Sequence, residues 1–290
     1  MRLAGSNGGE VVRASRAVVS NADAAGTLAL ARAAEGTLSS SSSSSPASPS
    51  SSTAGALSAQ SEKTPLLRSF VHLHAGFDAS GLEGKVDMHH LRVESWQGGG
   101  EGEENGKASR NTSKIDAEGN VSLISIASVA DPSLAPPGKH TLHAYYPATE
   151  PYDPWKKLLT EIERDGGMSK ENNRAKYEEF KEFRARNLIA AAEEAVPGLR
   201  ERSEVFLIGG PLTHERYLNR SKGSYGPGWI AGKGFPSTKG PAGLPDNLFC
   251  VGDFAFPGVG VPAVAASGAV AASSIVGAAE HWRLLNELGI

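Results

Sequence analysis

The sequence Asn247-Leu-Phe-Cys-Val-Gly-Asp253, continued by Phe254-Ala-Phe-Pro-Gly-Val-Gly-Val-Pro-Ala263, is the most diagnostic part of this chain. It predicts a short apolar strand, a Gly-Asp turn, a glycine-rich loop and a helix that opens with proline. Because the strand has no polar face, we expect it inside a sheet that is covered on both sides. In α/β folds, ligands bind at the carboxyl ends of such strands, which is where this turn lies.

The turn and loop contain residue types that allow the backbone and one carboxylate to contact a polar cofactor. Asp253 could accept hydrogen bonds from ligand hydroxyls, and Gly258 and Gly260 let backbone N–H groups approach closely. The amino terminus of the following helix favours an anionic or electron-rich group. The alternative is a tightly packed core helix that Asp253 caps. The match of Gly258 to Ala263 to the dinucleotide fingerprint is weak by itself, and the sequence has no following strand to carry the acidic residue expected some twenty positions later.

Composition excludes several classes of protein. The chain has 290 residues, 39% hydrophobic content and a net charge of -3, so it can build a core but has no basic signal for nucleic acid or a polybasic membrane surface. Its one cysteine, Cys250, rules out a disulfide framework and a cysteine-based zinc site. No uninterrupted apolar stretch is long enough to span a bilayer.

Changes of composition divide the chain into four segments. The serine run from Ser39 to Ser45 cannot bury enough apolar surface to offset its ordering entropy, so disorder is predicted around it. Alternating strands follow from residue 70, and helices are predicted at 155–164 and 172–196. The segments are 1–35, strands of a partial domain; 36–64, a disordered insert; 65–240, a domain with a flexible loop at 97–120; and 241–290, the turn and helix described above.

The histidines and one polar cluster are further candidates for chemistry. His72 and His74 share a strand face and His89-His90 follow, so a metal site is conceivable; the alternative is a set of polar residues in a sheet or at a pocket rim. No carboxylate stands at ligand spacing, and we assign no metal.

The cluster His214-Glu-Arg216 could hold acid/base groups. The alternative is a structural helix start capped by Thr213. No Gly-x-Ser-x-Gly elbow or P-loop occurs, and the catalytic residues stay unassigned.

Several segments together resemble the carotenoid isomerases (prolycopene isomerases) of plants and cyanobacteria, which belong to the phytoene desaturase-like, FAD-dependent amine-oxidase superfamily. The resemblance runs from about Pro65 to the end, and residues 9–22 also resemble a family segment. That match argues against the other interpretation of the Arg-, Ala- and Ser-rich start, a transit peptide. The segments are His72–Asp78, Ser128–His140, His143–Tyr152, Gly210–Tyr217, Gly223–Pro227 and Phe249–Gly268.

The resemblance implies an α/β fold: an incomplete FAD/NAD(P)-binding Rossmann-like domain with an α+β substrate domain on a mostly antiparallel sheet. The family begins with a strand and a G-x-G-x-x-G cradle for the FAD pyrophosphate, which this sequence lacks, so it reads as a carboxyl-terminal fragment. By position in the family, the residues facing the ribityl and isoalloxazine parts of FAD would be Gly252, Asp253, Gly260, Val261, Pro262 and Ala263.

The function implied by the resemblance is a step of carotenoid biosynthesis in the plastid (chloroplast). The flavoprotein would isomerise poly-cis lycopene to all-trans lycopene, a redox-neutral reaction that requires reduced FAD. Its partner would be a hydrophobic carotenoid, and peripheral membrane contact stays open. Pro211-Leu-Thr-His-Glu-Arg216 favours the isomerase branch. The alternatives are a carotenoid desaturase or retinol-saturase-like reductase, and an inactive fragment that binds no flavin.

Overall fold

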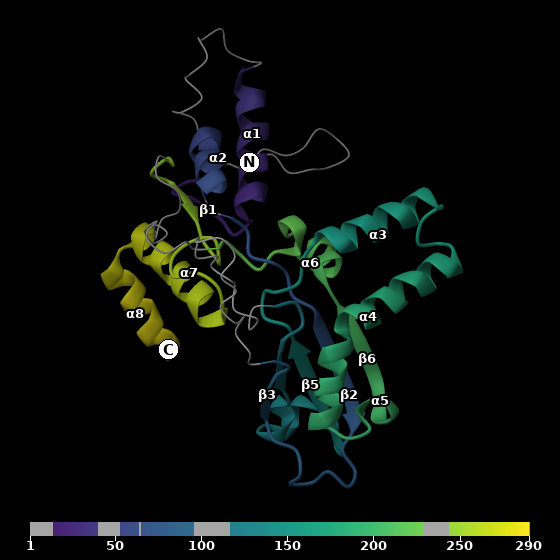
Figure 1. Cartoon of the computed structure of the whole chain (residues 1–290). Coiled ribbons are helices and arrows are strands. Elements are labelled where there is room, and N and C mark those ends of the chain that lie inside the picture. The colour runs from purple at the N-terminus through teal and green to yellow at the C-terminus, as the bar shows by residue number, and fades with distance from the viewer. Residues whose placement is uncertain (1–13, 40–52, 64, 96–116, 229–243, 290) are drawn as a thin grey trace, which may run out of the picture. The chain divides into compact units, whose positions relative to one another are not determined.

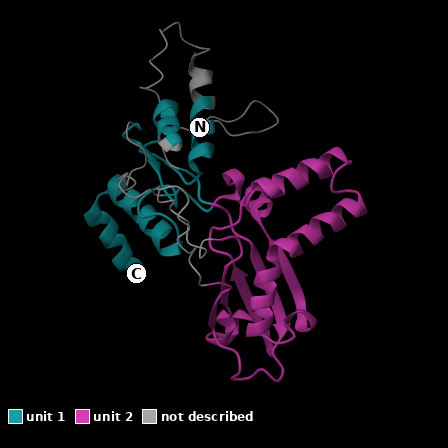
Figure 2. Ribbon diagram, in the orientation of Figure 1, with its two compact units in different colours: residues 1–67, 225–290 teal, residues 68–224 magenta. Residues whose placement is uncertain are grey.

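The computed structural model describes residues 14–39, 53–63, 65–95, 117–228 and 244–289 (Figure 1). The chain forms two compact units (Figure 2). Unit 1 comprises residues 1–67 and 225–290, and unit 2 comprises residues 68–224. Unit 2 thus ends at Ser224, whereas the sequence analysis extends the corresponding segment to residue 240.

Unit 2 is built on a five-stranded sheet in which every neighbouring pair of strands is antiparallel. The spatial order is β3 (His89–Val93), β4 (Val121–Ser125), β5 (Lys139–Tyr145), β2 (His72–Asp78) and β6 (Ser203–Gly209). The expected mostly antiparallel sheet is therefore confirmed. Side chains alternate along β2, so that Leu73, Ala75 and Phe77 are buried in the core while the histidines between them lie on the other face.

One long helix, α4 (Glu171–Ala195), packs against the core face of this sheet (Figure 1). Its buried Ala185, Leu188 and Ala192 belong to the same hydrophobic cluster as the strand residues. Small alanines let the helix approach the sheet closely, and the remaining face carries charged residues. The other helical elements of unit 2 are α3 (Asp153–Arg164), α5 (Leu199–Arg202), α6 (Pro211–Leu218), η3 (Ala127–Val129), η4 (Pro132–Leu134) and η5 (Ser221–Gly223).

A buried carboxylate joins the helices of unit 2 to its sheet. Glu150, only 1% exposed, accepts hydrogen bonds from the Arg184 Nε at 2.7 Å and Nη2 at 2.9 Å. It also accepts one from the Trp155 indole at 2.5 Å. The bidentate contact with the guanidinium and the hydrogen bond from the indole together offset the desolvation cost of burying the carboxylate.

Unit 1 contains the two-stranded parallel sheet of β1 (Val18–Ser20) and β7 (Leu248–Cys250). Phe249 and Cys250 are buried, but Val18 and Val19 are 41% and 49% exposed. Because consecutive strand residues point to opposite faces, β7 itself is covered on both sides as expected, whereas its neighbour β1 is partly exposed; in the described residues β7 pairs with β1 alone. Parallel strands need cover on both faces, and here that cover is partial. The helices of unit 1 are α1 (Ala24–Ser39), α2 (Thr53–Lys63), α7 (Val261–Val276) and α8 (Ala278–Leu288).

The predicted disorder at 36–64 is contradicted at both ends of that segment. Helix α1 continues to Ser39, and α2 occupies Thr53–Lys63. The reason is apolar burial: Leu57 is 1% exposed and Ala54 8%, in an alanine-rich sequence that favours helix. Residues 40–52, with most of the serine run, and 96–116, with most of the predicted loop 97–120, lie outside the described residues. None of the described helices combines the length and the apolar composition that crossing a bilayer requires.

Candidate functional site

The Gly-Asp turn follows β7 directly and is tied to both neighbouring elements. The Val251 N–H donates to the Ser20 carbonyl oxygen of β1 at 2.9 Å. The Gly252 N–H donates to the Ser267 hydroxyl at 3.1 Å, and Ser267 is fully buried in α7. The turn therefore has a fixed position between the strand and the helix, as a ligand-positioning turn requires.

Three glycines of this segment, Gly252, Gly258 and Gly260, adopt backbone angles that other residues avoid. Gly252 has φ 96°, and a Cβ there would lie 2.5 Å from the Asn21 side-chain oxygen, so close packing also excludes a larger residue. Gly260 has φ 108°, but a Cβ there would meet no atom of the described residues within 4 Å. Because no packing neighbour fills that position, the backbone at Gly260 borders open space that a ligand group can enter.

Helix α7 begins beside this space with exposed backbone groups. Gly260 is its N-cap residue and supplies no side-chain cap, while Val261 is 80% exposed. The first N–H groups of a helix have no intrahelical acceptor, and Pro262 has no N–H at all, which leaves the amides of Val261 and Ala263. The interpretation of Asp253 as the helix cap is wrong, because the helix starts later, at the glycine.

Asp253 itself is buried, with 6% of its surface exposed. The backbone of Gly226 passes close to it, since a Cβ on that glycine would lie 3.4 Å from the Asp253 Oδ2. The structure thus places all the residues proposed from the resemblance in one turn and one helix start of unit 1. These residues are Gly252, Asp253, Gly260, Val261, Pro262 and Ala263.

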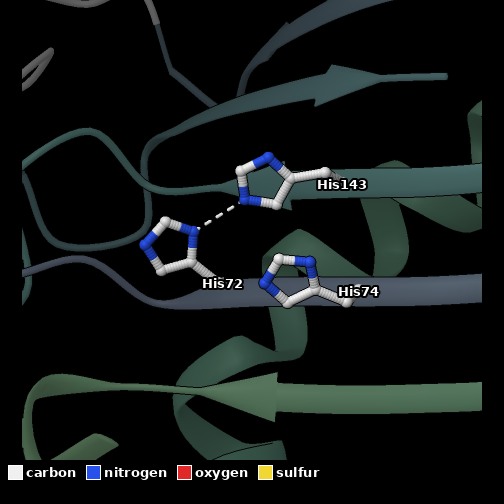
Figure 3. Close-up of side chains that lie close together, drawn as sticks. All are labelled: His72, His74 and His143. Atoms are coloured by element: carbon white, nitrogen blue, oxygen red, sulfur yellow. Dashed lines mark hydrogen bonds between the residues drawn. The ribbon is translucent and has the colours of Figure 1, made fainter. Parts of the chain in front are cut away.

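A second candidate site lies on the outer face of the sheet in unit 2, where three histidines meet (Figure 3). The antiparallel register sets His74 of β2 directly opposite His143 of β5. His72 lies two residues before His74 and therefore on the same face. Its Nδ1 is 2.8 Å from the His143 Nε2, a hydrogen bond between two imidazoles.

The three rings are stacked and their protonation is suppressed. The ring centroids of His74 and His143 are 4.6 Å apart, and those of His72 and His143 are 5.1 Å apart. Burial, together with the neighbouring histidines, lowers the pKa of His72 to about 3. Burial and the nearby His74 lower the pKa of His143 to about 4. Burial also lowers the pKa of His74. The cluster is therefore neutral near pH 7.

The histidines expected from the sequence to form one group are divided in the structure. His89 contacts the Ser125 hydroxyl at 3.0 Å and His90 the Asp87 carbonyl oxygen at 3.0 Å, and neither belongs to the three-histidine cluster. His143, which the sequence analysis did not single out, takes their place. The sequence shows the alternation of the strand that contains His143, but only the pairing register of β2 with β5 places His143 opposite His74.

The three side chains of the polar cluster in α6 contact different partners. The His214 Nδ1 lies 3.2 Å from the Ser69 hydroxyl, which itself donates to the Gly223 carbonyl oxygen at 2.6 Å. Glu215 instead accepts a hydrogen bond from the Tyr152 hydroxyl at 2.8 Å. The Arg216 guanidinium stacks on its neighbour, the ring of Tyr217.

The helix α6 starts earlier than expected. Its N-cap residue is Gly210, and the Thr213 hydroxyl accepts a hydrogen bond from the Gly210 N–H at 3.2 Å. The threonine thus satisfies a backbone donor at the helix start, from within the first turn.

Comparison with known proteins gives relatives over most of the chain. No protein-family model matches it. The prolycopene isomerase of Daucus carota is 34% identical over 215 residues, which are 71% of this chain and 29% of the relative. That of Arabidopsis thaliana is 33% identical over 215 residues, 71% of this chain and 30% of the relative. Prolycopene isomerase 2 of an Oncidium hybrid cultivar is 33% identical over 214 residues, with the same shares.

The chain spans less than a third of the length of these relatives. Each of them is chloroplastic by name, in agreement with the plastid localisation that the resemblance implies. Among solved structures, an oxidoreductase from Methanosarcina mazei matches with a TM-score of 0.37 and 17% identity, over 88% of this chain and 42% of that one. In its matched region the chain is therefore homologous to the prolycopene isomerases, which confirms the resemblance found in its sequence.

Proposed function

We propose that this chain forms part of an FAD-dependent carotenoid isomerase that converts poly-cis lycopene to all-trans lycopene. The observation that carries the proposal is the 34% identity over 215 residues to a prolycopene isomerase. Identity at this level over so long a stretch supports a shared fold and a shared class of chemistry. We assign the cofactor to the Gly-Asp turn of unit 1 and the substrate to the outer face of the sheet in unit 2.

The Gly-Asp turn fits the sugar-alcohol part of a flavin. Asp253 would accept hydrogen bonds from ribityl hydroxyls, and the Val261 and Ala263 amides would donate to polar flavin atoms. Gly260 leaves the space through which that contact is made. Reduced FAD held there would donate electron density to the polyene transiently and regain it, so that the isomerisation is redox-neutral. The chain's own part would be to orient the cofactor, with Asp253 as a hydrogen-bond acceptor and the backbone amides as donors.

The outer face of the sheet in unit 2 suits a long apolar substrate. Its register aligns one row of residues across all five strands: Leu91, Leu123, Tyr145, His72 and Gly209. At about 4.8 Å between neighbouring strands, this row is about 19 Å long. Leu91 at one end is 62% exposed, and in the next row Leu207 is 61% exposed.

Such a face stabilises a polyene through apolar burial and ring stacking rather than through hydrogen bonds. Phe70 stacks on His72 at 5.5 Å between centroids, and Tyr145 lies 5.6 Å from Phe70, so flat rings line the middle of the row. The exposed leucines lie on the two edge strands of the sheet, and the aromatic and histidine rings lie between them. A carotenoid has the matching chemistry, since its chain is long, flat and without polar groups.

The proposal is tested by supplying the purified 290-residue chain with FAD, a reductant and poly-cis lycopene. Chromatography separates the geometric isomers, and mass spectrometry counts hydrogen gained or lost. We expect all-trans lycopene of unchanged mass. A product with fewer hydrogens would assign the chain to the desaturases, and one with more to the reductases. Unchanged substrate, beside a working reference isomerase, would contradict the enzyme proposal for this polypeptide.

A further inference from the structure

The three histidines on the sheet of unit 2 have ligand atoms close enough to share a metal ion. One nitrogen of each ring lies within 4.8 Å of the other two, and Figure 3 shows the three rings side by side on neighbouring strands. His72 and His74 come from one strand and His143 from the next, so the backbone of a hydrogen-bonded sheet holds all three. Ligands on strands are held more precisely than ligands on loops.

The nitrogens are close to coordination spacing, but the rings are nearly parallel and must also rotate until their nitrogens point at one ion. With metal–nitrogen bonds of about 2.0–2.1 Å at a tetrahedral angle, the nitrogens of two ligands stand about 3.3 Å apart. The His72 and His143 nitrogens, at 2.8 Å, must separate slightly, and the third must approach. Rotation of the rings about their side-chain bonds provides movements of this size. The proton shared by the two nitrogens moves to the outer nitrogen of its own ring, a change of tautomer without a change of charge.

The protonation state of the three imidazoles and their accessibility from solvent also suit metal binding. Neutral imidazole is the ligand form, and burial holds the pKa of His72 and His143 well below 7. His74 is exposed and His143 half-buried, so an ion can reach the site from solvent. Phe70 and Tyr145 stand beside His72 and shield that side of the cluster.

We propose that His72, His74 and His143 bind one divalent transition-metal ion, with Zn²⁺ as the ion of choice. A set of nitrogen ligands without sulfur or carboxylate suits zinc, copper or nickel rather than magnesium or calcium. Three protein ligands leave a coordination position open, as in zinc sites that bind water or a further ligand. His214, whose ring centroid is 4.9 Å from that of His72, stands next to the cluster. The site is independent of the proposed flavin site, which lies in the other unit.

Calorimetric titration of the tag-free, chelator-treated full chain with Zn²⁺ tests this site. We expect one ion per chain, and affinity lowered at least about a hundredfold in His143→Ala and in His74→Ala, more than the loss of a supporting residue causes. The matched control is His89→Ala, a histidine on the same face of β3 outside the cluster, which leaves the affinity unchanged. Circular dichroism verifies the fold of each variant.

The proposal is overturned if the wild-type chain binds no Zn²⁺, or if His143→Ala and His74→Ala bind it as well as His89→Ala does. Should a variant fail to fold, the Co²⁺ complex of the wild-type chain decides. Intense visible bands of four- or five-coordinate Co²⁺ would support the site. The faint bands of hydrated, six-coordinate Co²⁺ would contradict it.

Discussion

At the scale of single residues, the ion pair of Glu150 and Arg184 is the most deeply buried one among the described residues of unit 2. Glu150 is 1% exposed and Arg184 has a side chain 14% exposed, so little water screens them. Replacing Glu150 by Gln removes the buried countercharge of the guanidinium and leaves it paired only with the more exposed Glu118. We expect Glu150→Gln to lower the free energy of unfolding by about 3 kcal/mol. Urea unfolding followed by circular dichroism measures it.

Glu118 provides the matched control, because it pairs with the same guanidinium at 2.9 Å but is 44% exposed. Exposed ion pairs contribute little, so Glu118→Gln should change the stability by less than about 1 kcal/mol. Equal losses in the two variants would show that the burial of Glu150 does not set the strength of this pair.

At the scale of elements, the outer face of strand β6 tests the substrate proposal. Leu207 is 61% exposed and lies opposite His74, on the face assigned to the polyene. Threonine preserves β propensity but removes apolar surface, so Leu207→Thr should weaken lycopene binding by roughly fivefold, about 1 kcal/mol. Quenching of protein fluorescence by added lycopene reports the affinity.

The control for this variant is Leu134→Thr in the short helix η4, where the leucine is similarly exposed at 53% but lies outside the sheet. It should leave lycopene binding unchanged, and both variants should unfold at nearly the wild-type urea concentration. If Leu134→Thr weakens binding as much as Leu207→Thr, general surface hydrophobicity explains the binding and the sheet face does not.

Elements with a strong local pattern could be predicted from the sequence. Helix α4 and strands β2 and β5 follow from periodicity, and the Gly-Asp turn follows from its residue types. Helix α2 could not, because its short alanine-rich sequence is embedded in a serine-rich segment and depends on burying Leu57. The histidine cluster was predicted only in part, since His143 reaches it through a register that no local sequence pattern encodes.

At the scale of the whole molecule, the chain divides into two compact units with different kinds of site. Unit 1 holds the turn and helix start that we assign to the flavin, and unit 2 holds the histidine cluster and the apolar sheet face. The Rossmann-like character proposed for unit 1 rests on one parallel strand pair with the turn at its carboxyl end. The relatives are more than three times as long as the matched region, so the activity of their full length is proposed here and not transferred.

The central claim, that the turn at β7 and the start of α7 contact a flavin, is tested most directly by titrating FAD with the full chain and following flavin fluorescence. Gly260 and Gly277 both have positive φ, at 108° and 90°, and both have open space where a Cβ would stand. Alanine at either position therefore imposes a similar backbone strain. Gly260 is the N-cap of α7, at the proposed site, whereas Gly277 is the N-cap of α8, away from it.

We predict that the wild-type chain and the Gly277→Ala variant bind FAD with the same affinity, measured by the change in flavin fluorescence. The Gly260→Ala variant should bind FAD at least about tenfold more weakly, because its methyl group occupies the space of the flavin contact. No change of fluorescence with the wild-type chain, or equal affinities of Gly260→Ala and Gly277→Ala, would contradict the assignment of this turn to the flavin.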